Sequence, residues 1–167
     1  MATLTLKGNK INTIGELPKV GTTAPDFELV KTDLSTVSLK DYKGSRVILN
    51  IFHSIDTSTC IASARQFNIE ASELENTKIL CISKDLPFAM TRFCDAEGIK
   101  NLEMLSDYVD GQFGKDYNLL YVDGVIKGLL SRCIIILDEN SKIIYTEQVE
   151  ETSKEPNYKA ALEALYN

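Results

Sequence analysis

The sequence predicts an α/β fold in which a central mixed sheet is flanked by helices and preceded by an N-terminal β-hairpin. Two apolar runs of strand length, residues 46–52 and 77–83, are nearly continuous, as is typical of strands covered on both faces. A helical pattern lies between them, so the two strands should be parallel neighbours. Two further strand patterns and a closing helix follow toward the C-terminus.

The N-terminal segment predicts a β-hairpin followed by an extended strand. Residues 3–7 and 10–14 alternate polar and apolar side chains around a Gly-Asn pair, which favours a tight turn. Residues 21–29 then pass through a turn marked by Pro25 and continue as another extended segment.

Two helices are expected in the middle of the chain. The first begins at Thr59 or Cys60, because apolar residues recur there at spacings of three and four. The second has Pro87 near its first turn and Gly98 as its stop, with Cys94 between them. The apolar positions of the first helix are Ile61, Ala64, Phe67, Ala71 and Leu74.

The C-terminal third completes the pattern. Residues 132–138 and 143–149 are strands joined by a connection short enough to make them an antiparallel hairpin, and residues 158–165 form a closing helix. A βαβ unit followed by ββα is the order of the thioredoxin fold. Because no repeat, low-complexity tract or long linker interrupts it, we expect residues 1–167 to form one domain.

Length and charge limit the classes of protein to which the chain can belong. With 167 residues it can bury about 70% of its unfolded surface, so it needs neither disulfides nor a metal for stability. Its 18 lysine and arginine residues against 24 aspartate and glutamate residues give a net charge of −6. Nucleic acids and anionic membranes are bound through clustered positive charge, so this balance argues against both and favours a small or neutral substrate.

The N-terminus and the cysteines favour a cytoplasmic location. The first residues lack the basic start and apolar core of a signal peptide, and no apolar run approaches the length of a membrane span. Cys60, Cys81, Cys94 and Cys133 are too few for a disulfide scaffold and have no C-x-x-C pair or neighbouring histidines. We therefore expect no metal and no cofactor, and cysteines that are either core residues or transient redox groups.

Cys60 is the most informative residue of the sequence. It follows an apolar strand pattern and a short polar stretch, at the expected start of a helix, where unpaired N–H groups and the helix dipole favour a thiolate. Thr57, one turn earlier, offers a hydroxyl to whatever the sulfur attacks. Cys81 and Cys133 lie within apolar strand patterns, and we expect both to be buried and inert, with Cys133 on the opposite strand face from Arg132.

Three separated blocks resemble the bacterial thiol peroxidases, a branch of the peroxiredoxins. The first is Ser54-Ile55-Asp56-Thr57-x-x-Cys60, the second spans residues 83–98, and the third is Gly128-Leu129-Leu130-x-Arg132. The similarity runs nearly end to end, as far as residues 155–162. A lone T-x-x-C motif would be unspecific, whereas three blocks in the correct order are specific.

This resemblance implies a set of site residues. Cys60 is then the peroxidatic cysteine, Thr57 its hydroxyl partner, Arg132 the guanidinium beside the sulfur, and Cys94 the resolving cysteine. The planar donors of Arg132 can hold the thiolate and the peroxide oxygens together. Attack on hydrogen peroxide or on an alkyl or lipid hydroperoxide would give a sulfenic acid, which condenses with a thiol to a disulfide. The resemblance further implies a disulfide between Cys60 and Cys94 of one chain, recycling by a thioredoxin-like reductant, and a homodimer.

Each site residue also has a more ordinary interpretation. From spacing alone, Arg132 could be a surface ion-pair residue, Thr57 a helix N-cap, and Cys94 part of the core. His53 departs from the family pattern, because peroxiredoxins resemble one another in having proline seven residues before the peroxidatic cysteine. Loss of proline's fixed φ implies a looser and wetter pocket. The ordinary interpretation of His53 is a partly buried ring with no catalytic role.

Other functions remain open from the sequence. A thiol-based peroxide sensor would be oxidised without sustained turnover, and a non-catalytic binding module would keep only the fold. A disulfide oxidoreductase is disfavoured because the chain has no C-x-x-C motif. Peroxide consumption coupled to a reductant separates these functions.

Overall fold

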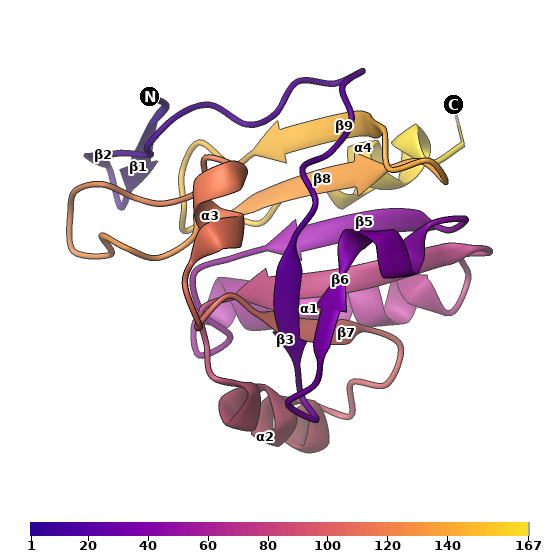
Figure 1. Ribbon diagram of the computed structural model, residues 1–167. Coiled ribbons are helices and arrows are strands. Elements are labelled where there is room, and N and C mark those ends of the chain that lie inside the picture. Colours follow the sequence, from indigo (N-terminus) through magenta and orange to yellow (C-terminus); the bar gives the residue numbers. More distant parts are fainter. Residues whose placement is uncertain (167) are drawn as a thin grey trace.

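The computed structural model describes residues 1–166, and its centre is a mixed sheet of seven strands (Figure 1). The strands of the chain are β1 Thr3–Leu6, β2 Asn9–Asn12, β3 Glu28–Lys31, β4 Thr36–Ser38, β5 Arg46–Ile51, β6 Thr77–Ser83, β7 Glu103–Ser106, β8 Cys133–Leu137 and β9 Ile143–Gln148. The order across the large sheet is β4-β3-β7-β6-β5-β8-β9, while β1 and β2 form a separate sheet of their own.

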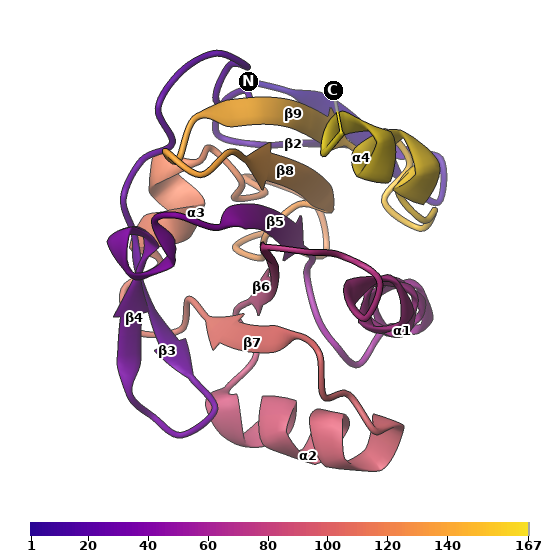
Figure 2. The same cartoon turned by 90° about the vertical axis from the view of Figure 1, so that its right-hand side faces the viewer.

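Helices cover both faces of the large sheet. They are η1 Leu39–Tyr42, a short 3-10 helix, and the α-helices α1 Ser58–Ala71, α2 Pro87–Glu97, α3 Gln112–Asp116 and α4 Tyr158–Ala164. Phe67 of α1 and Ala161 of α4 pack on the same face, against Ile48 and Ile134 of the central strands. α3 lies on the opposite face (Figure 2).

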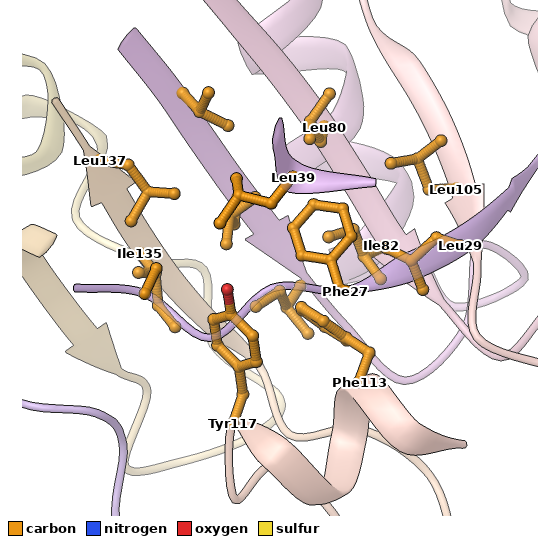
Figure 3. Packing of buried hydrophobic residues seen from close by; sticks show 14 of the residues in the cluster. Phe27, Leu29, Leu39, Leu80, Ile82, Leu105, Phe113, Tyr117, Ile135 and Leu137 are labelled. Carbon is orange, nitrogen blue, oxygen red and sulfur yellow. The ribbon is translucent and has the colours of Figure 1, made fainter. Parts of the chain in front are cut away.

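The largest apolar cluster lies on the face covered by α3 (Figure 3). Leu80 and Ile82 of β6 point into it, and Phe27 and Phe113 meet edge to face with ring centroids 5.5 Å apart. Tyr117 joins them through a ring contact with Phe113 at 4.5 Å. This dense packing fixes one face of β5 and β6, so that the ends of these strands are rigid positions from which to build a site.

The predicted central pairings are confirmed. β5 and β6 are parallel neighbours, β8 and β9 are antiparallel, and β1 pairs with β2 as a hairpin. α1 begins at Ser58, one residue before Thr59, the first of the two predicted starts, because Thr57 is the last residue with extended backbone. α2 begins at Pro87 and stops at Gly98, whose φ of 65° is a left-handed conformation that suits glycine.

Several short elements were not predicted. β7 lies between β3 and β6, β4 extends the sheet edge, and α3 is a single short helix. The whole architecture is the thioredoxin-like arrangement with an N-terminal hairpin. Within residues 1–166, no helix combines the length and the apolar character that a membrane crossing requires.

Candidate active site

Cys60 lies in the first turn of α1, just beyond the end of β5, and its side chain is fully buried. It packs in an apolar cluster with Phe52 and Ile55 of the preceding loop and with Met90 of α2. The strand ends here because residues 52–57 turn the chain from the sheet into the helix. Cys60 is the third residue of this helix, at the end where the first N–H groups have no intrahelical partner.

Arg132 supplies the charge that faces this sulfur. Its Nη2 donates a hydrogen bond to Cys60 Sγ at 3.2 Å, and its Nε donates to the carbonyl oxygen of Thr152 at 2.9 Å. Arg132 is only 1% exposed, so its interpretation as a surface ion-pair residue is wrong. A hydrogen bond from a guanidinium favours the thiolate over the thiol, since only the thiolate is a strong acceptor.

One donor of this guanidinium is free. Nη1 of Arg132 is buried and has no hydrogen-bond partner within the described part of the chain. A buried donor without a partner costs about 1–3 kcal/mol, and such groups are rare unless a ligand satisfies them. Nη1 is therefore a position at which an oxygen atom of a bound molecule can be held beside the sulfur.

Thr57 is the N-cap residue of α1 by its backbone, but its side chain does not cap the helix. Its hydroxyl donates to the carbonyl oxygen of Ser54 at 3.1 Å. The Thr57 oxygen thus keeps its acceptor capacity while its hydrogen is engaged in the loop. In this state Thr57 stabilises the turn before Cys60.

Asp85 organises the same loop and had no role in the sequence prediction. Its carboxylate accepts hydrogen bonds from Ser54 Oγ at 2.8 Å, from Ile55 N at 2.9 Å and from Ser83 Oγ at 2.6 Å. These bonds tie the loop before α1 to the loop between β6 and α2. The sequence did contain a signal for this role of Asp85, because Ser54 and the Ser83-x-Asp85 motif both belong to the blocks that carry the resemblance.

Cys94 lies on α2 and is a free thiol that packs against the apolar cluster to which Cys60 belongs. It is half-buried, and burial, followed by the nearby Asp95 carboxylate, raises the pKa of its thiol. Cys94 also lines a hollow of about 240 Å³ together with Lys31 and Glu103. The structure therefore brings Cys60 and Arg132 together and places Cys94 on a different helix, with one side toward solvent.

The other two cysteines are fully buried, as predicted. Burial raises the pKa of Cys81 to about 12 and raises that of Cys133 strongly as well. Cys133 belongs to the cluster on the opposite sheet face from Cys60, in agreement with the predicted strand alternation. Both thiols remain protonated near neutral pH and are poor nucleophiles.

His53 is buried beside the same site. It is 9% exposed, and its Nδ1 has no hydrogen-bond partner within residues 1–166. Burial and then the Arg132 charge lower the pKa of His53 to about 4, against a smaller opposing effect of Asp85. The imidazole is therefore neutral near pH 7 and contributes no positive charge to the Cys60 sulfur. Its burial is more complete than the sequence interpretation supposed.

The site is built from one sulfur and one guanidinium. Across residues 1–166, no group of three or more His, Cys, Asp or Glu side chains is placed to hold a metal ion. What the arrangement can do is present a nucleophilic sulfur to a small molecule whose oxygen atoms are held by Arg132.

The fold and the site together define a class, namely a thioredoxin-fold protein with a buried cysteine hydrogen-bonded by a buried arginine. Residues 19–162 match the family model described as Redoxin. A thiol peroxidase of Corynebacterium glutamicum is 50% identical over 165 residues, which cover 99% of each chain, and one of Mycobacterium tuberculosis is 48% identical with the same coverage. A peroxiredoxin-like protein from Aquifex aeolicus superposes with a TM-score of 0.94 at 31% identity, over 99% of this chain and 96% of that one.

The chain belongs to the thiol peroxidases of the Redoxin family. It is a peroxiredoxin-type enzyme that reduces peroxides by thiol chemistry.

Proposed function

We propose that Cys60 is the nucleophile of this thiol peroxidase and that Arg132 activates it and holds the peroxide. The observation that carries the proposal is the 3.2 Å contact between Arg132 Nη2 and Cys60 Sγ, beside the free Nη1 donor. Nη1 can hold a peroxide oxygen while Nη2 holds the sulfur, because the guanidinium is planar and rigid. The two reacting atoms then lie on one side of the same group, close enough to react.

The first step is attack of the Cys60 thiolate on one oxygen of the hydroperoxide. A sulfur–oxygen bond forms, the O–O bond breaks, and the departing oxygen takes a proton and leaves as an alcohol or water. Cys60 becomes a sulfenic acid, two electrons having passed from sulfur to the peroxide. The acceptor lone pairs of Thr57 and the donors of Arg132 are suited to hold the oxygens during this exchange.

The second step is condensation of the sulfenic acid with Cys94. The Cys94 sulfur attacks, a disulfide forms, and the hydroxyl leaves as water with the proton of the Cys94 thiol. A disulfide requires Cα atoms within about 7 Å, whereas each cysteine is held on its own helix. We propose that the first turn of α1, the last turn of α2, or both unwind before the bond forms.

The third step restores both thiols, and we propose a thioredoxin-like dithiol as the reductant. Its first thiolate attacks the disulfide, and its second releases the mixed disulfide, so that two electrons return to the cysteines. The hollow beside Cys94 supports attack at that sulfur, because it leaves part of Cys94 reachable while Cys60 is enclosed. We further propose that the chain, residues 1–167, acts as one domain in the cytoplasm on alkyl or lipid hydroperoxides as well as hydrogen peroxide.

We also propose a homodimer formed near the site. Exposed apolar side chains gather at the carboxyl ends of β6 and β7, where Leu86 and Phe88 are 51% and 69% exposed and Tyr108 and Val109 are 44% and 68% exposed. The two segments are joined by the bond from Asp107 N to Ser83 O. A self-complementary patch of this kind suits a two-fold interface.

Turnover tests the function. With thioredoxin, thioredoxin reductase and NADPH, the enzyme should consume many equivalents of hydrogen peroxide and of an alkyl hydroperoxide. Cys60→Ser should abolish consumption, Cys94→Ser should allow about one equivalent, and the buried Cys81→Ser should turn over normally as the matched control. Wild-type consumption that stops after one equivalent would indicate a sensor, and turnover by Cys60→Ser would refute the assignment of the nucleophile.

A further inference from the structure

The loop after β9 contacts three separate parts of the active-site region through three consecutive residues. Thr152 contacts Arg132, Glu151 contacts the β1–β2 hairpin, and Ser153 contacts the first turn of α1. We propose that Glu151, Thr152 and Ser153, here called the clamp, position the guanidinium on the Cys60 sulfur and make the N-terminal hairpin a working part of the site. The inference rests on the proposed function of Cys60.

Thr152 is the residue of the clamp that holds Arg132. It is fully buried, its carbonyl oxygen accepts from Arg132 Nε, and its hydroxyl lies 2.9 Å from that of Tyr121. Because the guanidinium is planar, an acceptor on Nε fixes the direction of both Nη atoms. The position of the Thr152 carbonyl therefore decides whether Nη2 reaches the sulfur and where the free Nη1 points.

The position of that carbonyl depends on the hairpin. Thr152 N donates to Thr5 O at 2.8 Å, and Thr5 N donates to Glu150 O at 2.8 Å. The loop after β9 therefore pairs with β1 through backbone hydrogen bonds. Tyr121 also packs with Leu4 and Ile11 of the hairpin. An isolated two-stranded hairpin is marginal in water, and these contacts with the body of the protein are what keep it ordered.

Glu151 holds the turn of the hairpin. Its carboxylate accepts from Lys7 N at 2.8 Å, Gly8 N at 3.1 Å and Thr5 Oγ1 at 2.7 Å, and also from Ser153 Oγ at 2.7 Å. Lys7 and Gly8 have positive φ, so their successive N–H groups form a concave anion-binding turn. The bonds from Ser153 and then Thr5 lower the pKa of Glu151, which keeps it ionised at any physiological pH.

Ser153 links the clamp to the helix that carries the nucleophile. Its carbonyl oxygen accepts from Thr59 Oγ1 at 2.9 Å, one residue before Cys60. The same short loop thus holds Arg132 through its Nε atom and holds the helix turn that carries Cys60. A shift of this loop moves both halves of the thiolate–guanidinium pair, although none of its residues touches the sulfur.

The test compares Glu151→Gln with Glu150→Gln, the same loss of charge one residue earlier on an exposed side chain. For Glu151→Gln we expect faster hydrogen exchange in residues 3–12 and slower alkylation of Cys60 by iodoacetamide at pH 7. The kcat/KM for peroxide should fall about tenfold, because a displaced Arg132 no longer aligns the reacting atoms. Glu150→Gln should match wild type in all three measurements.

Thr152→Val is the second variant, because it keeps the carbonyl and removes only the hydroxyl that contacts Tyr121. It should also slow alkylation of Cys60, with normal hairpin exchange, and it carries the test if Glu151→Gln does not fold, in which case alkylation at the wild-type rate would overturn the inference. The inference is overturned if hairpin exchange in Glu151→Gln is unchanged, or if it rises while alkylation and kcat/KM match those of Glu150→Gln. Turnover by Cys60→Ser would instead overturn the proposed function, so the two failures are distinguishable.

Discussion

His53 should make the stability of the fold depend on pH between 6.5 and about 4. Its folded pKa of about 4 lies below the ordinary imidazole value of about 6.5, because burial and the Arg132 charge oppose protonation. Below pH 6.5 the unfolded chain takes up a proton that the folded chain does not. The His53 contribution to stability is therefore fully present above pH 6.5 and is lost as the pH falls toward 4.

The size of this effect follows from the two pKa values. Between pH 7 and pH 5 the difference in proton uptake removes about 2 kcal/mol from the free energy of unfolding. Urea unfolding of the reduced protein at both pH values should show that loss in wild type but not in His53→Gln or His53→Pro. The pH-dependent change in the free energy of unfolding is compared between the three proteins, because the carboxylates contribute the same change to each. Parallel losses in the three proteins would show that His53 is not the buried neutral ring described above.

His53→Pro should also act on catalysis. The neutral imidazole places no positive charge beside the Cys60 sulfur. The backbone N–H of His53 has no hydrogen-bond partner within residues 1–166, so replacing it by proline breaks no hydrogen bond. Proline fixes φ and should make the turn before Cys60 tighter and drier. We expect a higher kcat/KM for peroxide at every pH from about 5.5 to 8, and slower over-oxidation, relative to wild type and to His53→Gln. A lower value, mainly on the acidic side, would mean that the histidine takes part in the reaction.

Four further outcomes are expected. Peptide mapping without reductant after one equivalent of peroxide should find Cys60 linked to Cys94 within the chain, and a dominant bridge to another cysteine would contradict the pairing. Hydrogen exchange should rise around Cys60 or around residues 92–98 in the disulfide form, whereas equal protection in both forms would exclude local unwinding. Asp85→Asn should lower the free energy of unfolding by about 1–3 kcal/mol in urea, because the amide cannot accept all three loop hydrogen bonds, and a change within error would show that they are not limiting. Phe88→Glu should yield a monomer by light scattering, while Ile69→Glu, an equally exposed position on α1, should not; an unchanged dimer would move the interface elsewhere.

The elements that sequence reasoning predicted are those with strong local patterns. β5 and β6 are covered on both faces, so nearly every residue is apolar, and α2 carries its own start and stop at Pro87 and Gly98. β7 was missed because it has four residues, too few to establish a period, and its partners lie far away in the chain. The pairing of β3 with β7 could not be predicted either, because it is determined by the tertiary fold and not by the local sequence of either strand.

The site shows a similar division. Cys60 and Arg132 could be predicted because reactive side chains stand in recognisable blocks, and the structure places them 3.2 Å apart. Asp85 could have been found, since serines and an aspartate flank both loops. Thr152 could not, because it contacts Arg132 through a carbonyl oxygen that every residue possesses. The neutrality of His53 also required the structure, because it follows from burial.

The enclosed position of Cys60 has a consequence for the energetics of the redox cycle. In the proposed cycle the Cys60 sulfur leaves the apolar cluster to meet Cys94, so the packing free energy of its contacts with Phe52, Ile55 and Met90 is lost on oxidation and recovered on reduction. For a two-electron couple, each 1.4 kcal/mol of such packing raises the reduction potential by about 30 mV. Packing of Cys60 in this cluster thus stabilises the dithiol relative to the proposed disulfide and makes that disulfide easier to reduce.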